Sequence, residues 1–172
     1  MAILFKFSDA VAIGLHAAMY LARNEGQSAT ARHIANTFDI SETHLVKVLQ
    51  AMNRAGLIKG TRGPGGGYRL AQSAEAIRLL DVVQALEGRL EVSGCLLRHP
   101  LCKNRNCLLA PLERKVNAET IDYLQNHSVR DMAQTLAEAV PDVAQTEEPD
   151  RKQSLQPGAA GATGTNGDGH EA

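Results

Sequence analysis

A glycine-rich turn between two short apolar segments is the feature that most restricts the fold of this 172-residue chain. Residues 60–67 read GTRGPGGG, a composition typical of turns and loops, while residues 57–59 and 68–70 suit short strands. Tyr68 and Leu70 alternate with a polar residue, as in a strand with one buried face. We therefore predict a β-hairpin here rather than a flexible linker, the other interpretation of the glycine run.

Three capped helices are expected before the hairpin. Ser8, Thr30 and Ser41 each precede a segment with apolar residues at helical spacing, so each suits an N-cap. The third helix carries its apolar face at positions 45, 48, 49 and 52, and Gly56 follows it as a left-handed terminator. The second and third helices, joined by a tight turn at 39–40, form a helix-turn-helix pattern. With the hairpin added, a winged helix is predicted.

The formal net charge of -1 conceals a strong asymmetry along the chain. Residues 1–72, the predicted winged helix-turn-helix domain, hold eight Lys/Arg and four Asp/Glu, a net +4. Residues 73–140 are nearly neutral, and residues 141–172 hold two basic and six acidic side chains, a net -4. A basic N-terminal segment favours a polyanionic partner, although a surface imbalance without function would give the same numbers.

The rest of the chain divides into a helical region and a tail. Helices are expected at 80–86, at 111–125 and, capped by Ser128, at 129–139. The 111–125 helix offers more apolar surface than a small winged helix can cover, so we expect a dimerisation helix rather than one folded back on its own domain. The tail is rich in Gly, Ala and Thr, and we expect it to be disordered. The predicted fold class is mainly α with a small β-hairpin.

The candidate DNA-binding residues lie on the third helix and on the hairpin. A helix in this position enters the major groove, and side chains near its N-terminal end can reach base edges. An arginine at a glycine-rich hairpin tip can enter a narrow minor groove. A solvated helix face is the alternative explanation, and the hairpin decides against it. The predicted residues are Ser41, Thr43, His44, Lys47, Arg62, Pro64 and Gly65.

Three cysteines, Cys95, Cys102 and Cys107, fall within 13 residues with C-x6-C-x4-C spacing, and the chain has no others. Soft thiolates select iron–sulfur clusters, zinc or copper(I). Structural zinc prefers four ligands with a closely spaced cysteine pair, which is missing here, although His99 could serve as a fourth ligand. A thiol–disulfide switch without metal is a further possibility.

Residues 40–71, ISETHLVKVLQAMNRAGLIKGTRGPGGGYRLA, resemble the signature of the IscR/NsrR (Rrf-two) family of bacterial winged-helix regulators. The opening segment FKFSDAVAIGLHAAMYLA is also similar, so the resemblance covers residues 1–139. It implies a homodimer that binds a palindromic double-stranded DNA operator. It also implies an iron–sulfur cluster on the three cysteines. We expect a cytoplasmic protein, because the sequence has no membrane span and no secretory signal, and a repressor rather than an activator.

The resemblance offers two sources for the fourth cluster ligand. IscR-like members use a His three positions after the last cysteine, where this chain has Ala110. NsrR-like members use an Asp from the first turn of the partner subunit's first helix, a position that Asp9 matches, although an acid there also suits the helix dipole. The resemblance to the nitric-oxide-sensing NsrR branch is therefore closer and favours a 4Fe–4S cluster. The cysteine spacing departs from both branches, so 2Fe–2S and signals such as redox or iron–sulfur status stay open.

Other classes of protein are less consistent with the sequence. No apolar stretch approaches the roughly 20 residues of a membrane span, so no membrane association is expected. The sequence shows no paired carboxylates, nucleophile motif or Walker-type phosphate loop, and we expect no enzyme. The alternative function is a cluster-free winged-helix regulator that responds through cysteine thiol oxidation or a small-molecule ligand.

Overall fold

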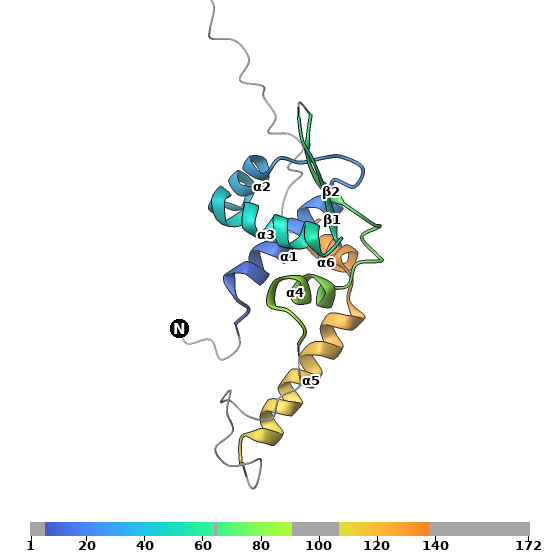
Figure 1. Ribbon diagram of the computed structural model, residues 1–172. Helices are drawn as coiled ribbons and strands as arrows, with labels where there is room; N and C mark the ends of the chain where they lie inside the picture. Colours follow the sequence, from blue (N-terminus) through green and yellow to red (C-terminus); the bar gives the residue numbers. More distant parts are fainter. Residues whose placement is uncertain (1–5, 64, 91–106, 138–172) are drawn as a thin grey trace, which may run out of the picture.

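The computed structural model describes residues 6–63, 65–90 and 107–137 (Figure 1). The described residues form six helices and one β-hairpin. Helix α5 extends away from the body that the other elements form (Figure 1). The mainly helical fold with a small hairpin is confirmed. No described helix is long and apolar enough to cross a membrane. The elements are α1 (Asp9–Arg23), α2 (Ala31–Phe38), α3 (Glu42–Arg54), β1 (Ile58–Thr61), β2 (Gly67–Leu70), α4 (Leu79–Glu87), α5 (Ala110–Asn126) and α6 (Val129–Ala137).

The predicted helix boundaries of the winged helix are confirmed by their capping bonds. Ser8, Thr30 and Ser41 accept hydrogen bonds from the backbone N–H groups three residues further on, at 3.2, 3.2 and 3.4 Å. Asp39, between α2 and α3, adopts a left-handed conformation with φ of 51° and so makes the helix-turn-helix corner. Gly56 ends α3 with a φ of +76°, which favours glycine.

The hairpin is longer than the sequence predicted. β1 reaches Thr61 and β2 begins at Gly67, so the turn is confined to residues 62–66 rather than 60–67. Gly60 pairs with Tyr68, and Thr61 pairs with Gly67. The expectation of a loop over the whole glycine run was wrong. Strand pairing uses backbone N–H and C=O groups, and glycine supplies these groups as other residues do.

The loop between α1 and α2 adds a further backbone pairing to the hairpin. Ala29 N donates to Tyr68 O at 2.9 Å, and Tyr68 N donates to Ala29 O at 2.8 Å. This approach is so close that a Cβ on Gly67 would lie 2.6 Å from the Ala29 carbonyl oxygen. The hairpin is therefore tied to the loop before α2 as well as to α3.

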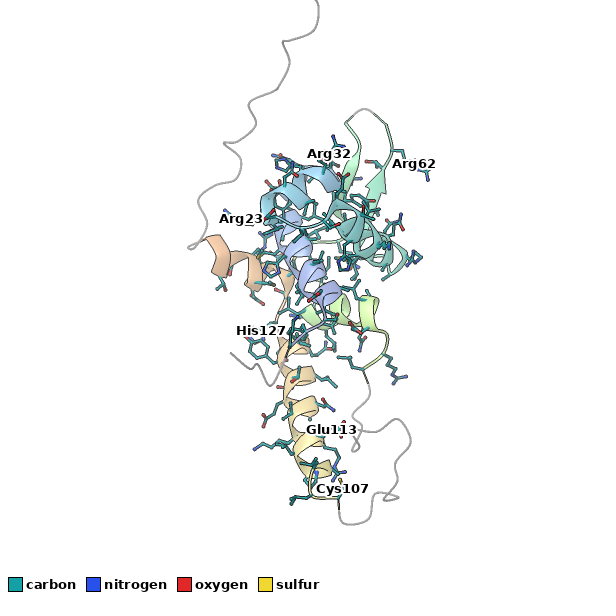
Figure 2. All side chains as sticks on the ribbon, turned by 90° about the vertical axis from the view of Figure 1, so that its left-hand side faces the viewer. Arg23, Arg32, Arg62, Cys107, Glu113 and His127 are labelled. Carbon is teal, nitrogen blue, oxygen red and sulfur yellow. The ribbon has the colours of Figure 1, made fainter. Side chains whose placement is uncertain are left out.

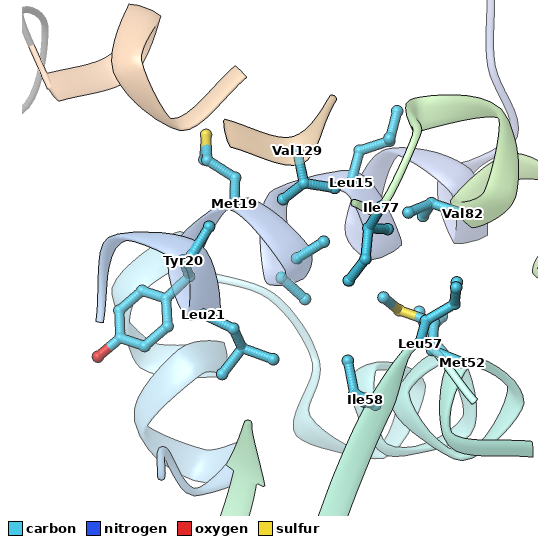
Figure 3. Packing of buried hydrophobic residues seen from close by; sticks show 14 of the residues in the cluster. Leu15, Met19, Tyr20, Leu21, Met52, Leu57, Ile58, Ile77, Val82 and Val129 are labelled. Carbon is cyan, nitrogen blue, oxygen red and sulfur yellow. The ribbon is translucent and has the colours of Figure 1, made fainter. Parts of the chain in front are cut away.

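The core is aliphatic and joins the winged helix to α4 and α6 (Figure 3). The predicted inner face of α3 is confirmed, since Leu45, Val48, Leu49 and Met52 are all buried. In Figure 3, Val129 of α6 lies close to Leu15 of α1, so α6 closes the side of α1 away from the hairpin. The C-terminal helix is therefore part of the same core as the winged helix.

A short backbone junction connects α4 with α5 and α6. Leu79 N donates to His127 O at 3.0 Å, and Val129 N donates to Ile77 O at 2.9 Å. Ser128 caps α6 as predicted, because its Oγ accepts from Asp131 N at 3.2 Å. The position of α5 is thus fixed at its C-terminal end, while its N-terminal end points away from the body (Figure 1).

Candidate nucleic-acid interface and sensor region

The recognition helix α3 presents most of its predicted DNA-binding residues to solvent. Ser41, Thr43 and Lys47 are exposed, and His44 is half-buried. Ser41 caps the helix, so the N-terminal turn of α3 is well formed and its side chains have fixed positions. We define the reading face as Thr43, His44 and Lys47 together with Arg62 of the hairpin.

Arg32 is a basic residue of this region that the sequence did not place. Its Nε lies 3.4 Å from the Glu42 carboxylate in the first turn of α3. This pair joins the two helices across the turn and offsets an acidic charge that would repel DNA phosphates. The pairing of residues ten positions apart follows from the angle between α2 and α3, which a sequence pattern does not supply.

The hairpin tip carries Arg62 and Gly65, both exposed, while Pro64 lies outside the described residues. Asn53, near the end of α3, accepts a hydrogen bond from Gly60 N at 3.3 Å through its side-chain oxygen. This bond ties the hairpin to the recognition helix. Figure 2 shows Arg32 and Arg62 at the same end of the molecule.

Of the three cysteines, only Cys107 belongs to the described residues; Cys95 and Cys102 lie outside them. Cys107 is a free, half-buried thiol directly before α5, and Figure 2 shows it at the end of α5 remote from the hairpin. Within the described part of the chain no three metal-binding side chains cluster. Three thiolates are nevertheless a donor set suited to an iron–sulfur cluster, and Cys107 is unpaired and available to be one of them.

Asp9, the candidate fourth ligand, is exposed in the first turn of α1. Its carboxylate lies 3.1 Å from Lys6 Nζ, and the side chain is 72% exposed. Such an exposed ion pair contributes little to stability and leaves the carboxylate accessible to another subunit. The Asp9 carboxylate is thus exposed at the start of α1, and its role as a ligand stays a prediction.

An arginine of α6 connects three parts of the fold. The Arg130 guanidinium forms ion pairs with Glu25, after α1, and with Glu75, before α4. The pKa of Glu75 is lowered by backbone hydrogen bonding and by Arg130, and the pKa of Arg130 is raised mainly by its hydrogen bond to Glu75. The loop that pairs with the hairpin through Ala29 is therefore held at its other end by α6.

Asp131 predicts an acid-dependent part of the stability. The Ser128 backbone N–H and hydroxyl donate to its carboxylate at 2.7 and 2.8 Å, and they lower the Asp131 pKa below its ordinary value of 3.8. Stability from this group is present above the ordinary pKa and is lost as pH falls through the lower folded value. We expect Asp131→Asn to reduce the melting temperature at neutral pH and to flatten its decline below about pH 4. Circular dichroism melts across that range measure it, with Asp122→Asn on α5 as the charge-matched control; an unchanged acid decline would contradict the prediction.

One side of α5 is apolar and uncovered. We define the α5 stripe as the exposed apolar residues on and just before this helix, which are Leu108, Leu109, Leu112, Val116 and Tyr123. By contrast, Leu124 is buried against the body. A groove of about 490 Å³ runs beside the stripe, with Val116 and Tyr123 on one side and Phe7, Leu15 and Met132 on the other. The sequence prediction of unused apolar surface on this helix is confirmed.

These features define a winged helix-turn-helix protein with a basic reading face and a helical extension. The sequence profile of the Rrf2 family, described as an iron-dependent transcriptional regulator, matches residues 7–135. The chain therefore belongs to the Rrf2 family of transcriptional regulators, and its homologues are regulators rather than enzymes.

Individual relatives agree with this assignment. The HTH-type transcriptional regulator BadM of Rhodopseudomonas palustris is 47% identical over 74 residues, which are 43% of this chain and 47% of BadM. The chain thus matches about half the length of this curated relative. The structure of CymR, the global cysteine regulator of B. subtilis, has a TM-score of 0.63 at 27% identity and covers 77% of this chain and 98% of CymR. IscR of T. potens has a TM-score of 0.63 at 27% identity, covering 79% of this chain and 91% of IscR.

Proposed function

We propose that this protein is a dimeric DNA-binding repressor whose operator affinity depends on an iron–sulfur cluster held by Cys95, Cys102 and Cys107. The observation that carries the DNA-binding part is the reading face, which combines a capped recognition helix with an arginine-tipped hairpin. The cluster part rests on the thiolate donor set and on the family description. Residues 1–72 would read DNA, residues 73–140 would sense and dimerise, and residues 141–172 would form a disordered tail.

The reading face suits both grooves of a duplex. Thr43, His44 and Lys47 lie near the N-terminal end of α3, the part of a recognition helix that contacts base edges. Arg62 would extend from the hairpin toward the neighbouring minor groove, where Gly65 allows close approach of the backbone. Pro64 is the other predicted contact of the hairpin tip. Ser41 positions the helix N-terminus toward a phosphate.

A twofold operator needs a twofold reader, and α5 offers the surface for it. The α5 stripe and the adjoining groove are apolar and exposed in the single chain. A second α5 packed against the stripe would remove these side chains from water. The dimer would place two reading faces on one side, matched to a palindromic operator.

The cysteine segment lies between α4 and α5 in the sequence. Helix α4 is part of the body, and α5 carries the proposed dimer contact. When bound, the cluster supplies a reactive iron centre whose state depends on redox conditions or on small diatomic molecules. Asp9 of the partner subunit would complete a 4Fe–4S cluster with a labile oxygen ligand, which favours nitric oxide as the signal; 2Fe–2S is the other cluster type. A change in the cysteine segment would shift α5 and so alter the spacing of the two reading faces.

The cluster hypothesis is tested by replacing Cys102 with serine. Anaerobically purified wild-type protein is expected to be coloured and to contain iron and acid-labile sulfide, and Cys102→Ser is expected to lose most of both. Operator affinity should then lose its response to nitric oxide. Asp9→Ala provides a separate comparison of the Mössbauer spectrum. A Cys102→Ser protein with wild-type iron, sulfide and nitric oxide response would contradict cluster-dependent control.

A second candidate is a cluster-free regulator that responds to thiol oxidation or to a small molecule. Two observations favour it. One is the similarity to CymR, which is described as the global cysteine regulator of B. subtilis. The other is the free, half-buried thiol of Cys107. Colourless protein that binds its operator fully without iron would support this candidate. Its response should then appear on adding a thiol oxidant or free cysteine.

A further inference from the structure

The outer face of the hairpin carries two cations directly opposite one another. Lys59 of β1 and Arg69 of β2 are partners in the strand register, and both side chains are exposed. Paired residues on one face of an antiparallel ladder have Cβ atoms about 5 Å apart, and like charges in that position oppose each other. We call Lys59 and Arg69 the outer cation pair.

Within the part of the chain that the structure describes, no carboxylate neutralises the outer cation pair. Among the described residues, Lys6, Arg32, Lys115 and Arg130 form ion pairs with carboxylates, whereas Lys59 and Arg69 do not. Their strand neighbours explain why these two side chains share a face. Ile58 is buried and Tyr68 and Leu70 are half-buried, so alternation turns Lys59 and Arg69 outward.

The distance from the hairpin tip fits a particular part of DNA. Lys59 lies three residues before Arg62, and strand residues rise about 3.4 Å each, so the pair stands roughly 10 Å behind the tip. The minor groove of B-DNA is about 7.5 Å deep. A hairpin that inserts Arg62 into the groove would therefore hold the outer cation pair just outside the groove opening, where its long side chains can reach the phosphates along the groove edge.

We propose that Lys59 and Arg69 together hold one backbone phosphate at the edge of the minor groove that receives Arg62. The inference rests on the proposed DNA-binding function and adds a sequence-independent contact to it. The guanidinium of Arg69 presents a planar set of donors to the phosphate oxygens, and the Lys59 ammonium adds a point charge. Gly60, which follows Lys59, is tied to Asn53 of α3, so the phosphate contact is fixed relative to the recognition helix.

The test uses the full chain and a duplex selected by the wild-type protein from a random pool. Affinity is measured by fluorescence anisotropy at several salt concentrations for wild type and for a Lys59→Gln, Arg69→Gln variant. Loss of one phosphate contact per subunit should reduce the salt slope by about 1.8 for a dimer. Selectivity between the chosen duplex and a mixed-sequence duplex should stay constant. The free variant should melt at or above the wild-type temperature, because a repulsive pair has been removed.

Two controls remove basic charge from α5, away from the hairpin. The first is Arg114→Gln alone. The second combines Arg114→Gln with Lys115→Gln and so has the same net charge as the hairpin double variant. Both controls should retain the wild-type salt slope. A hairpin variant with the slope of these controls would overturn the phosphate contact while leaving DNA binding intact. A hairpin variant that loses selectivity more than salt dependence would also overturn it, since a base contact would then be involved. Failure of wild type to bind any duplex would instead refute the proposed function.

Discussion

Replacing Val116 with Asp is expected to dissociate the proposed dimer and to abolish tight binding to a palindromic operator. Val116 lies in the middle of the α5 stripe and lines the apolar groove beside it. A carboxylate enclosed there without a partner costs about 3 to 5 kcal/mol, and the symmetric contact contains it twice. The dimer dissociation constant should therefore rise at least about 100-fold.

Sedimentation equilibrium measures the dimer, and anisotropy with operator and half-site duplexes measures its effect on DNA binding. Ala118→Asp is the matched control, because it introduces the same charge at an exposed position on another side of α5. That control should remain dimeric. The Val116→Asp chain should keep its helical circular dichroism spectrum and its weak half-site binding, since Val116 is not part of the buried core. A dimer of wild-type strength in Val116→Asp would place the dimer contact elsewhere.

The winged helix was predictable from sequence because its signals are local. Capping residues such as Ser8, Thr30 and Ser41 specify helix starts through bonds that span three residues. The apolar spacing of α3 likewise gave its buried face correctly. Even the hairpin was found from its glycine run, although its strands extend further into that run than side-chain composition suggested.

The contacts that the sequence did not predict join residues far apart in the chain. Arg130 reaches Glu25 and Glu75, and Ala29 pairs with β2, because α6 folds back along α1 and brings these loops together. Such contacts depend on helix packing angles, which periodicity does not contain. The candidate DNA-binding residues could be named from the sequence because each was chosen for its position on α3 or on the hairpin, and their contact with DNA stays a prediction. The proposed cysteine site is different, since a ligand set shared between two subunits would depend on the assembly.

The long-range contacts suggest how the two halves of the chain influence each other. The loop 24–30 is held by Arg130 of α6 at one end and by the hairpin strand β2 at the other. The junction of residues 127–130 with 74–79 links the same helix to α4 and α5. A displacement of α5 would therefore reach the hairpin through packed backbone segments as well as through the geometry of the proposed dimer.

Replacing Gly67 with Ala is expected to break the close contact between the hairpin and the loop before α2. The new Cβ would lie 2.6 Å from the carbonyl oxygen and 2.8 Å from the carbonyl carbon of Ala29, and these backbone atoms cannot rotate away as a side chain would. The two hydrogen bonds between Ala29 and Tyr68 must then lengthen or break. We expect a loss of about 2 to 4 kcal/mol of unfolding free energy, or roughly 4 to 16 °C in melting temperature.

Gly65→Asn separates this clash from a general effect of altering the glycine run. Gly65 has a φ of +76° with no atom near its Cβ position, and Asn accepts a left-handed conformation at modest cost. The control should melt close to wild type in thermal denaturation, while Gly67→Ala melts early and binds operator weakly because its hairpin is displaced from α3. Ala29→Gly is the informative companion: it leaves the Ala29 carbonyl in place, so it should not rescue Gly67→Ala. A Gly67→Ala protein with wild-type melting and operator affinity would show that the position of the hairpin does not depend on the loop before α2. That result would also contradict the proposed coupling from α6 through this loop to the hairpin.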